Sequence, residues 1–306
     1  MHVLPDGDVF CATPIEIQIP RSFRYHPDTG AVTPVALLAD RDYQAPKIAA
    51  SIDTASVLLP LTLANRNRPS VLLCGGSTPL RIDLADEHPT WRPAGQRKLQ
   101  GPRFNLNAVI LPTGEIFVSG GVADKTHDRT AVRVAEMYHA DTDTWEALEA
   151  ASVVRNYHSV ALLMPDGAVW TAGSNRNGMP SDPQNDTREL AIEIYRPWYF
   201  DRDRPVLVAA PEGITYSPDG GDTFPVTVDF GTAHRIRRVV LIRTASTTHG
   251  FSSDQRYVEL EFRGSDSDDL LVTPPRSGGI APPGVYLIHV VDDAGVPSMG
   301  TFIALA

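Results

Sequence analysis

The chain has 306 residues and a formal net charge of −10, with 42% hydrophobic residues. This acidic balance argues against a general nucleic-acid-binding surface and against binding to anionic membranes. No run approaches the roughly 18 apolar residues of a membrane-spanning helix, and the first residues lack the basic head and apolar stretch of a signal peptide.

A strand–turn–strand pattern recurs along the first two thirds of the chain. Glycine-containing turns such as Pro-Asp-Gly join the two strands in three of the four copies, and a longer polar loop joins them in the second. Gly114 and Gly167 hold the same place in consecutive copies, and the period of about fifty residues is typical of kelch-type propeller blades. The four copies are residues 1–12, 56–77, 107–121 and 157–173.

The repeat ends near residue 196, after a polar loop at 175–187 and a strand at 190–195. A Pro- and Arg-containing linker follows near 197–206. The remaining residues contain short, alternating strands separated by turns, which is an immunoglobulin-like sandwich pattern. We therefore predict an all-β chain, with about four blades of an incomplete propeller at 1–196 and a sandwich at 197–306. The sandwich strands are expected at 224–230, 236–243, 257–262, 269–272, 285–292 and 300–305.

Tyr157 and His158 are two good metal ligands at the start of the fourth hairpin. Successive strand residues face opposite ways, so both reach one metal only if the strand is bent or just beginning there. His249 lies in a long polar segment at 244–256 that follows a buried strand. Two imidazoles and a phenolate suit copper better than calcium or magnesium, and zinc remains open. The sequence does not show that His249 and His158 meet, and all three residues could simply be packed or solvated.

The surroundings of these residues resemble a known family. Residues 155–159 (Arg-Asn-Tyr-His-Ser), before Leu-Met-Pro-Asp-Gly, resemble the Tyr-His copper motif of the galactose oxidase/glyoxal oxidase family. Thr248-His249 with 254–256 (Asp-Gln-Arg) resembles its C-terminal copper-histidine loop. The resemblance covers essentially the whole chain and is strongest over 103–306. It implies a seven-bladed kelch propeller followed by an immunoglobulin-like early set domain, which sends a histidine loop toward the propeller axis.

The resemblance also implies roles for the three ligands. Tyr157 would be the axial copper ligand and the base toward the substrate hydroxyl, and His158 and His249 would be the equatorial imidazoles. The substrates would be small alcohols, aldehydes or sugars, with O2 reduced to H2O2. Relatives are largely exported, which suggests a secreted or cell-surface protein, although the chain itself shows no export signal.

The chain departs from the family at the radical cofactor, a tyrosine covalently joined to a cysteine in the early blades. Cys11 and Cys74 both end apolar strands, in contexts unlike the cross-linking cysteine, and Tyr25 and Tyr43 have no matching context. The Tyr-Cys cofactor is therefore not identifiable. We expect a truncated member that is catalytically incomplete alone, binds copper weakly at most, and has the missing N-terminal blades as a partner. The two cysteines are expected to be buried thiols, with a disulfide left open.

Other functions compete with this one. If the three ligands do not converge, a non-catalytic carbohydrate- or protein-binding module is favoured. A hydrolase using Ser159, His158 and Asp166 is a weaker alternative, because no Gly-x-Ser-x-Gly surrounds the serine. Packing or scaffold roles are expected for Trp91, Trp145, Arg103 and Arg155, and a brace of the His249 loop or a solvated pair for Asp254 and Arg256.

Overall fold

The computed structural model describes residues 1–12, 21–38, 55–76, 78–95, 102–123, 130–174, 189–231, 235–264 and 268–306. The predicted loop at 175–187 and Tyr43 lie outside these residues. Within them the long elements are all strands, and the helical structure is the short 3-10 helix η5 (Trp198–Asp201). The all-β prediction is confirmed. None of the described helices is long and apolar enough to cross a membrane.

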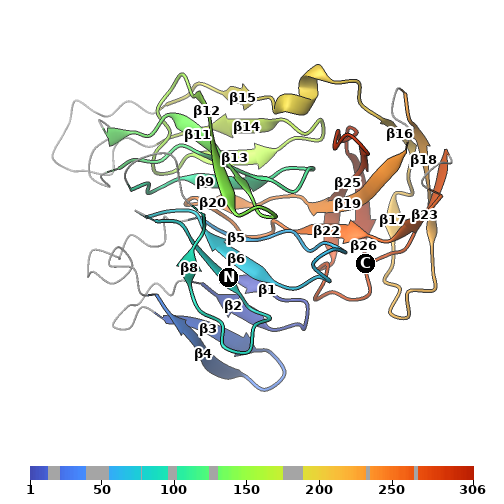
Figure 1. Ribbon diagram of the computed structural model, residues 1–306, viewed down its shortest axis with the longest axis horizontal. Coiled ribbons are helices and arrows are strands. Elements are labelled where there is room, and N and C mark those ends of the chain that lie inside the picture. Colours follow the sequence, from blue (N-terminus) through green and yellow to red (C-terminus); the bar gives the residue numbers. More distant parts are fainter. Residues whose placement is uncertain are drawn as a thin grey trace.

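Four antiparallel sheets follow one another along the first part of the chain, and we number them I to IV (Figure 1). In each, strands that are consecutive in sequence are neighbours in the sheet. They coincide with the four predicted units, and their assignment as kelch blades of an incomplete ring stays a prediction. Sheet I contains β1 (His2–Val3), β2 (Val9–Cys11), β3 (Arg21–His26) and β4 (Ala31–Leu37); sheet II contains β5 (Ser56–Leu58), β6 (Ser70–Leu73), β7 (Leu80–Asp83) and β8 (Arg92–Pro93); sheet III contains β9 (Asn107–Ile110), β10 (Ile116–Ser119), β11 (Val134–His139) and β12 (Thr144–Ala150); sheet IV contains β13 (Val160–Leu163), β14 (Val169–Ala172) and β15 (Glu193–Tyr195).

The first hairpins of sheets III and IV turn in the same way, as the repeat predicts. The amides of Gly114 and Gly167 each donate to the carbonyl oxygen three residues earlier, at 2.9 Å in both cases. Both glycines have positive φ, 92° and 85°, which a residue with a Cβ rarely adopts. The turn chemistry read from the sequence therefore sets these two hairpins locally.

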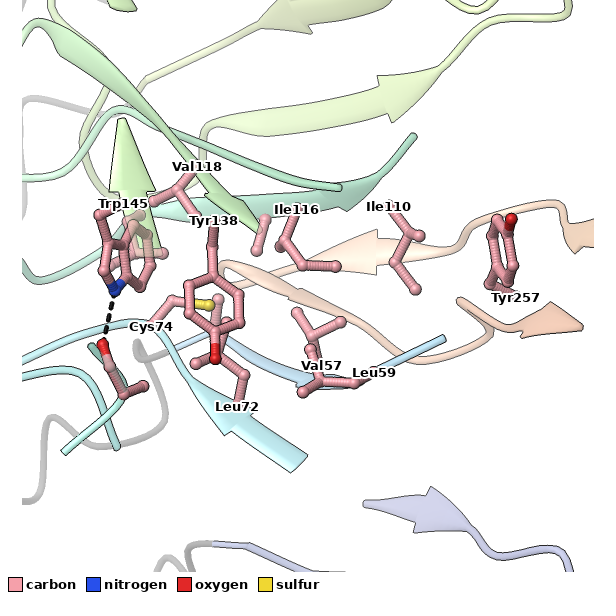
Figure 2. Close-up of a cluster of buried hydrophobic side chains, with 14 of the residues drawn as sticks. Val57, Leu59, Leu72, Cys74, Ile110, Ile116, Val118, Tyr138, Trp145 and Tyr257 are labelled. Carbon is pink, nitrogen blue, oxygen red and sulfur yellow. Dashed lines mark hydrogen bonds between the residues drawn. The ribbon is translucent and has the colours of Figure 1, made fainter. Parts of the chain in front are cut away.

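Consecutive sheets are held together by apolar side chains that alternate along each strand. Figure 2 shows the cluster between sheets II and III, in which Val57 and Leu72 pack beside Ile110, Ile116 and Tyr138. Similar clusters join sheets I and II and sheets III and IV. Burial of these side chains is the main contribution to the stability of the array.

Two tryptophans link neighbouring sheets by hydrogen bonds as well as by packing. The Trp145 indole N–H donates to the carbonyl oxygen of Ala94 at 2.7 Å (Figure 2). The Trp91 indole donates to the hydroxyl of Ser22 in sheet I at 2.8 Å. The packing role predicted for both residues is confirmed.

Nine of the remaining described strands form two sheets that face each other, with their inner side chains in one cluster, and β20 (Thr247–Thr248) and β21 (Phe251–Ser252) form a separate hairpin. The predicted strands are present here, and four further short ones, β16, β17, β20 and β21, were not predicted. The pairing changes from sheet IV to the sandwich between β15 and β16, and the division at residue 196 stays a prediction. One sheet contains β16 (Val206–Ala209), β18 (Phe224–Asp229), β24 (Asp269–Val272) and β23 (Phe262–Arg263); the other contains β17 (Gly213–Ile214), β26 (Thr301–Leu305), β25 (Gly284–Asp292), β19 (Ile236–Arg243) and β22 (Tyr257–Leu260).

One stretch of the sandwich, residues 247–259, contacts all four sheets at or beside their first strands; we call it the axial segment. The Thr247 hydroxyl donates to the carbonyl oxygen of Ala161 in sheet IV at 3.3 Å. At sheets III and II, the Ile110 amide donates to Gln255 Oε1 (2.7 Å) and the Leu61 amide donates to the Tyr257 carbonyl oxygen (3.1 Å). In sheet I, the Val3 carbonyl oxygen accepts from Arg256 Nη2 (2.5 Å). Figure 1 shows β22 beside β5, where Leu61 and Val258 form a bridge. The segment thereby fixes the sandwich against the sheets.

Of the two alternatives for Asp254 and Arg256, the solvated pair is wrong. Asp254 accepts a hydrogen bond from Arg243 at 2.8 Å, and Arg256 is buried with its guanidinium directed to sheet I. Arg243, the last residue of β19, thus takes the place of Arg256 as the partner of Asp254. Cys11 and Cys74 form no disulfide, and only Cys74 is fully buried.

Candidate metal centre

Tyr157 and His158 occupy a tight turn immediately before strand β13. The Ser159 amide donates to the Asn156 carbonyl oxygen at 3.0 Å, which closes the turn around them. His158 has φ of 62°, a left-handed conformation that is uncommon for residues other than glycine. The alternation of strand side chains therefore does not yet apply, and the two rings stack with centroids 3.9 Å apart at 29°. The sequence analysis required the strand to be bent or just beginning if both side chains are to reach one metal. The strand begins directly after these two residues, so this requirement is met.

His249 lies at the tip of a hairpin formed by β20 (Thr247–Thr248) and β21 (Phe251–Ser252). The two loop residues, His249 and Gly250, both have positive φ, 53° and 73°, as in a type I′ turn. This hairpin was read from the sequence only as a polar segment. It carries the imidazole from the sandwich toward sheet IV.

The structure brings the three predicted ligands together. The His249 ring lies 5.4 Å from that of Tyr157 and 5.0 Å from that of His158, at interplanar angles of 66° and 80°. A metal held at about 2 Å by nitrogen and oxygen donors can be shared by three rings at these centroid separations. His158 is exposed, and the other two residues are half-buried. The three-ring cluster is therefore accessible from the side of His158, and a substrate would need such access.

A buried polar network holds both ends of the Tyr157–His158 turn. Asn105 Nδ2 donates to Asn156 Oδ1, and Asn107 Nδ2 donates to Ser159 Oγ, both at 2.8 Å. All four residues are buried. Sequence reasoning missed the two sheet III asparagines, although the repeat sets Asn107 opposite Ser159 in consecutive copies. Buried hydrogen bonds of this kind fix the position of the groups they join.

The same contacts contradict the hydrolase alternative. The Ser159 hydroxyl is buried and bonded to Asn107. Asp166 lies in the turn at the other end of β13, where its carboxylate accepts from the Ala168 amide at 2.9 Å. Serine and aspartate therefore flank opposite ends of one strand and form no triad with His158.

Gly173 lies directly against the turn, at the end of strand β14. A Cβ added there would be 2.9 Å from the His158 carbonyl oxygen, and the residue has φ of 69°. Only glycine permits this approach without a shift of the backbone. Gly173 therefore allows the backbone of His158 to lie close to the end of β14.

Arg155 has the scaffold role expected from the repeat. Its guanidinium donates to the carbonyl oxygens of Gly173 (2.9 Å) and Ala191 (2.7 Å), and burial lowers its pKa. Arg103, its equivalent in sheet III, is paired with buried Glu136 at 3.1 Å. Both arginines connect strands within their own sheets.

Among the described residues, the ring contacts of Tyr157, His158 and His249 are with one another. Tyr138 is instead in the core with Cys74 (Figure 2). Its hydroxyl donates to Asp143 at 2.6 Å. Burial, and hydrogen bonding to Asp143, raise the pKa of Tyr138. The structure therefore supplies no second tyrosine to the three-ring cluster within the described residues.

Two known protein families match consecutive parts of the chain. Residues 77–199 match the family described as glyoxal oxidase N-terminus, and residues 204–305 match the galactose oxidase-like, early set domain. The chain belongs to the galactose oxidase/glyoxal oxidase family. The family domains meet near the linker that the sequence predicts.

Individual members of this family align over much of the chain. A galactose oxidase of Gibberella zeae is 30% identical over 198 residues, covering 64% of this chain and 28% of the relative. An aldehyde oxidase of Arabidopsis thaliana is 28% identical over 296 residues, covering 82% of this chain and 47% of the relative. The galactose oxidase/glyoxal oxidase-like chain thus spans half or less of the length of these relatives.

A solved structure supports the fold of this family member. A fungal alcohol oxidase of the AA5 family, in complex with copper, superposes with a TM-score of 0.74 over 99% of this chain and 74% of that chain. The identity is 20%, so the likeness concerns the fold.

Proposed function

We propose that this chain supplies the copper-binding part of an oxidase that acts on a small alcohol, aldehyde or sugar and reduces O2 to H2O2. The observation that carries the proposal is the convergence of Tyr157, His158 and His249 from two parts of the fold. The names of the relatives, galactose oxidase and aldehyde oxidase, support the substrate class. That convergence is not expected of a non-catalytic binding module, which needs no such cluster.

The three side chains fit a copper ion by their chemistry. Two neutral imidazoles and a phenolic oxygen are donors that copper accepts well, and hard cations such as magnesium and calcium prefer all-oxygen sites. His158 and His249 would hold the ion, and Tyr157 would complete the set. Bound copper would supply one-electron redox chemistry.

Tyr157 would also move a proton. Oxidation of a primary alcohol to an aldehyde removes two electrons and two protons, and O2 takes up all four to become H2O2. The phenolate oxygen of Tyr157 would accept the hydroxyl proton of the substrate as its general base. The exposure of His158 beside it leaves room for a substrate to approach this oxygen.

The outer faces of sheets I and IV support the idea that the chain is incomplete alone. Across sheet I a row in register, Val9–Tyr25–Val32, lies on the side away from sheet II, with Tyr25 42% and Val32 60% exposed. In sheet IV, Trp170 pairs with Ile194, which is 43% exposed, on the side away from sheet III.

Sheet III shows how such rows are normally covered. Its rows containing Ile116–Tyr138 and Phe117–Met137 pack against sheets II and IV, respectively, and all four side chains are buried. The open rows of sheets I and IV are equivalents of these two faces. Apolar side chains that lie side by side and exposed on a sheet face mark interaction surfaces. We therefore infer that further sheets of the same kind cover them and bring the missing part of the site.

Copper titration of the purified chain, followed by electron paramagnetic resonance, tests the proposal together with a peroxidase-coupled assay for H2O2. We expect weak binding of Cu2+ that His249→Asn removes, with no sustained H2O2 production. Absence of Cu2+ binding, or binding unchanged by His249→Asn, would count against the metal site and favour a binding module. Robust H2O2 production by the chain alone would overturn its incompleteness.

A further inference from the structure

We propose that Thr248 is a positioning residue that fixes the tautomer of His249, so that Nε2 is the nitrogen presented to the metal; this rests on the proposed function. The Thr248 hydroxyl lies 2.7 Å from His249 Nδ1. A neutral imidazole has one N–H and one lone pair. If Nδ1–H donates to the hydroxyl oxygen, the lone pair is on Nε2.

The backbone makes this contact possible. His249 is the first loop residue of a type I′ turn, with φ of 53°, and Thr248 is the last residue of β20. Asparagine is the common residue at this turn position, because its short amide bonds locally and tolerates positive φ. Histidine has no such short amide, and the Thr248 hydroxyl supplies its local partner.

The direction of the ring is consistent with this role. Nδ1 faces back along the hairpin to Thr248, while the ring as a whole approaches Tyr157 at 5.4 Å and His158 at 5.0 Å. Metal-binding histidines generally donate their other ring N–H to a nearby oxygen, which fixes tautomer and orientation. For His249, the nearby oxygen is the hydroxyl of Thr248.

Nitrogen-15 NMR of the metal-free chain tests the tautomer without any metal. We expect His249 to be in the Nδ1–H form in the wild type and in Thr248→Ser, and to shift toward the Nε2–H form in Thr248→Val. An Nε2–H form in the wild type, or a tautomer unaffected by Thr248→Val, would overturn the inference whatever the chain does with copper.

Cu2+ titration then tests the consequence. Thr248→Val should weaken binding by about 10- to 100-fold, with Thr248→Ser close to wild type, as for other outer-shell partners of ligating histidines. Thr244→Val, outside the hairpin, is the control for a lost threonine hydroxyl. Because His249→Asn alone is expected to remove Cu2+ binding, thermal unfolding is the second readout, and Thr248→Val should unfold within a few degrees of the wild type. Weaker binding together with a clearly lowered unfolding temperature would mean that Thr248 acts only on the fold. A wild type that binds no Cu2+ but shows the Nδ1–H form would refute the proposed function and leave the tautomer assignment standing.

Discussion

The imidazole of His158 meets that of His249 edge to face, at a centroid distance of 5.0 Å and an angle of 80°, and both residues have left-handed backbones. For a residue with a Cβ this conformation costs roughly 1–2 kcal/mol. Strain of this kind persists where the surrounding structure over-determines it, and it clusters at functional sites. Here a buried network and a type I′ hairpin impose it on the two candidate ligands.

Replacing either histidine by asparagine should separate ligand loss from turn strain, because asparagine tolerates positive φ. We expect His158→Asn and His249→Asn to fold with stability within about 1 kcal/mol of wild type and to lose measurable Cu2+ binding. Calorimetric titration and thermal unfolding measure the two quantities. His139→Asn, at a partly exposed histidine paired with Glu115 far from the cluster, should bind Cu2+ as the wild type does.

Gly173→Ala should displace the turn that carries His158. The new Cβ would meet the His158 carbonyl oxygen at 2.9 Å and would sit on a backbone with φ of 69°. We expect a loss of about 1–3 kcal/mol in the free energy of unfolding, measured with urea, and weaker Cu2+ binding. Gly30→Ala is a matched control, since its φ is 71° and nothing lies within 4 Å of its Cβ position. Equal stability of the two variants would contradict the close packing.

Trp145→Phe should loosen the contact between sheets II and III. The buried carbonyl oxygen of Ala94 loses the indole N–H at 2.7 Å, which costs about 1–3 kcal/mol when the oxygen is left unsatisfied. Chemical denaturation measures this directly. Trp91→Phe breaks a bond to the partner Ser22, which keeps its own bond to the Ala12 carbonyl oxygen, and should cost less.

The free energy of unfolding should decrease as the pH is lowered, and protonation of His289 should account for part of the decrease. This histidine is fully buried in β25, with Nδ1 donating to the Ser298 carbonyl oxygen at 3.0 Å, and burial lowers its pKa to about 4. The unfolded chain has a histidine pKa of about 6.5, so it binds the proton more readily than the folded chain. The contribution of His289 is therefore fully present above pH 6.5 and is lost as the pH falls to 4, by up to about 3 kcal/mol.

His289→Gln should flatten this part of the pH profile of the free energy of unfolding, because glutamine does not titrate. Urea denaturation at pH 7, 6, 5 and 4 provides the comparison. A wild type and a variant with parallel profiles would show that His289 does not carry the effect.

Charge placed on the open apolar rows should be tolerated, in contrast to the covered ones. Val32→Lys and Ile194→Lys change exposed positions in sheets I and IV, and we expect unfolding free energies within about 0.5 kcal/mol of wild type and less self-association by light scattering. Met137→Lys, in the covered row of sheet III, buries an unpaired charge and should unfold the chain. Unfolding by the first two variants would mean that these faces are already packed.

Local chemistry explains what the sequence predicts well. Pro-Asp-Gly and Pro-Thr-Gly turns fix hairpins by themselves, and the long apolar run of β19 was predicted with its observed bounds, 236–243. Alternating apolar residues gave most of the other sandwich strands for the same reason. By contrast, β16 and β17 are short and partly exposed, so they carry little of this pattern.

The hairpin that carries His249 is harder to predict, although a signal exists. Two threonines, then His-Gly, then Phe-Ser match a two-residue hairpin, with histidine in place of the usual asparagine. The meeting of the three rings depends on the axial segment and its contacts with four sheets, which no local pattern encodes. The erroneous solvated pairing of Asp254 with Arg256 has the same origin, because a distant strand supplied the competing Arg243.

The axial segment follows the four sheets in the sequence, so it is synthesised after them. A growing polypeptide whose four sheets have already left the ribosome carries Tyr157 and His158, but it lacks the hairpin that bears His249. The three-ring cluster can therefore close only late in biosynthesis, when Thr247 reaches Ala161 and Gln255 reaches Ile110. Until then the chain carries only two of the three candidate ligands.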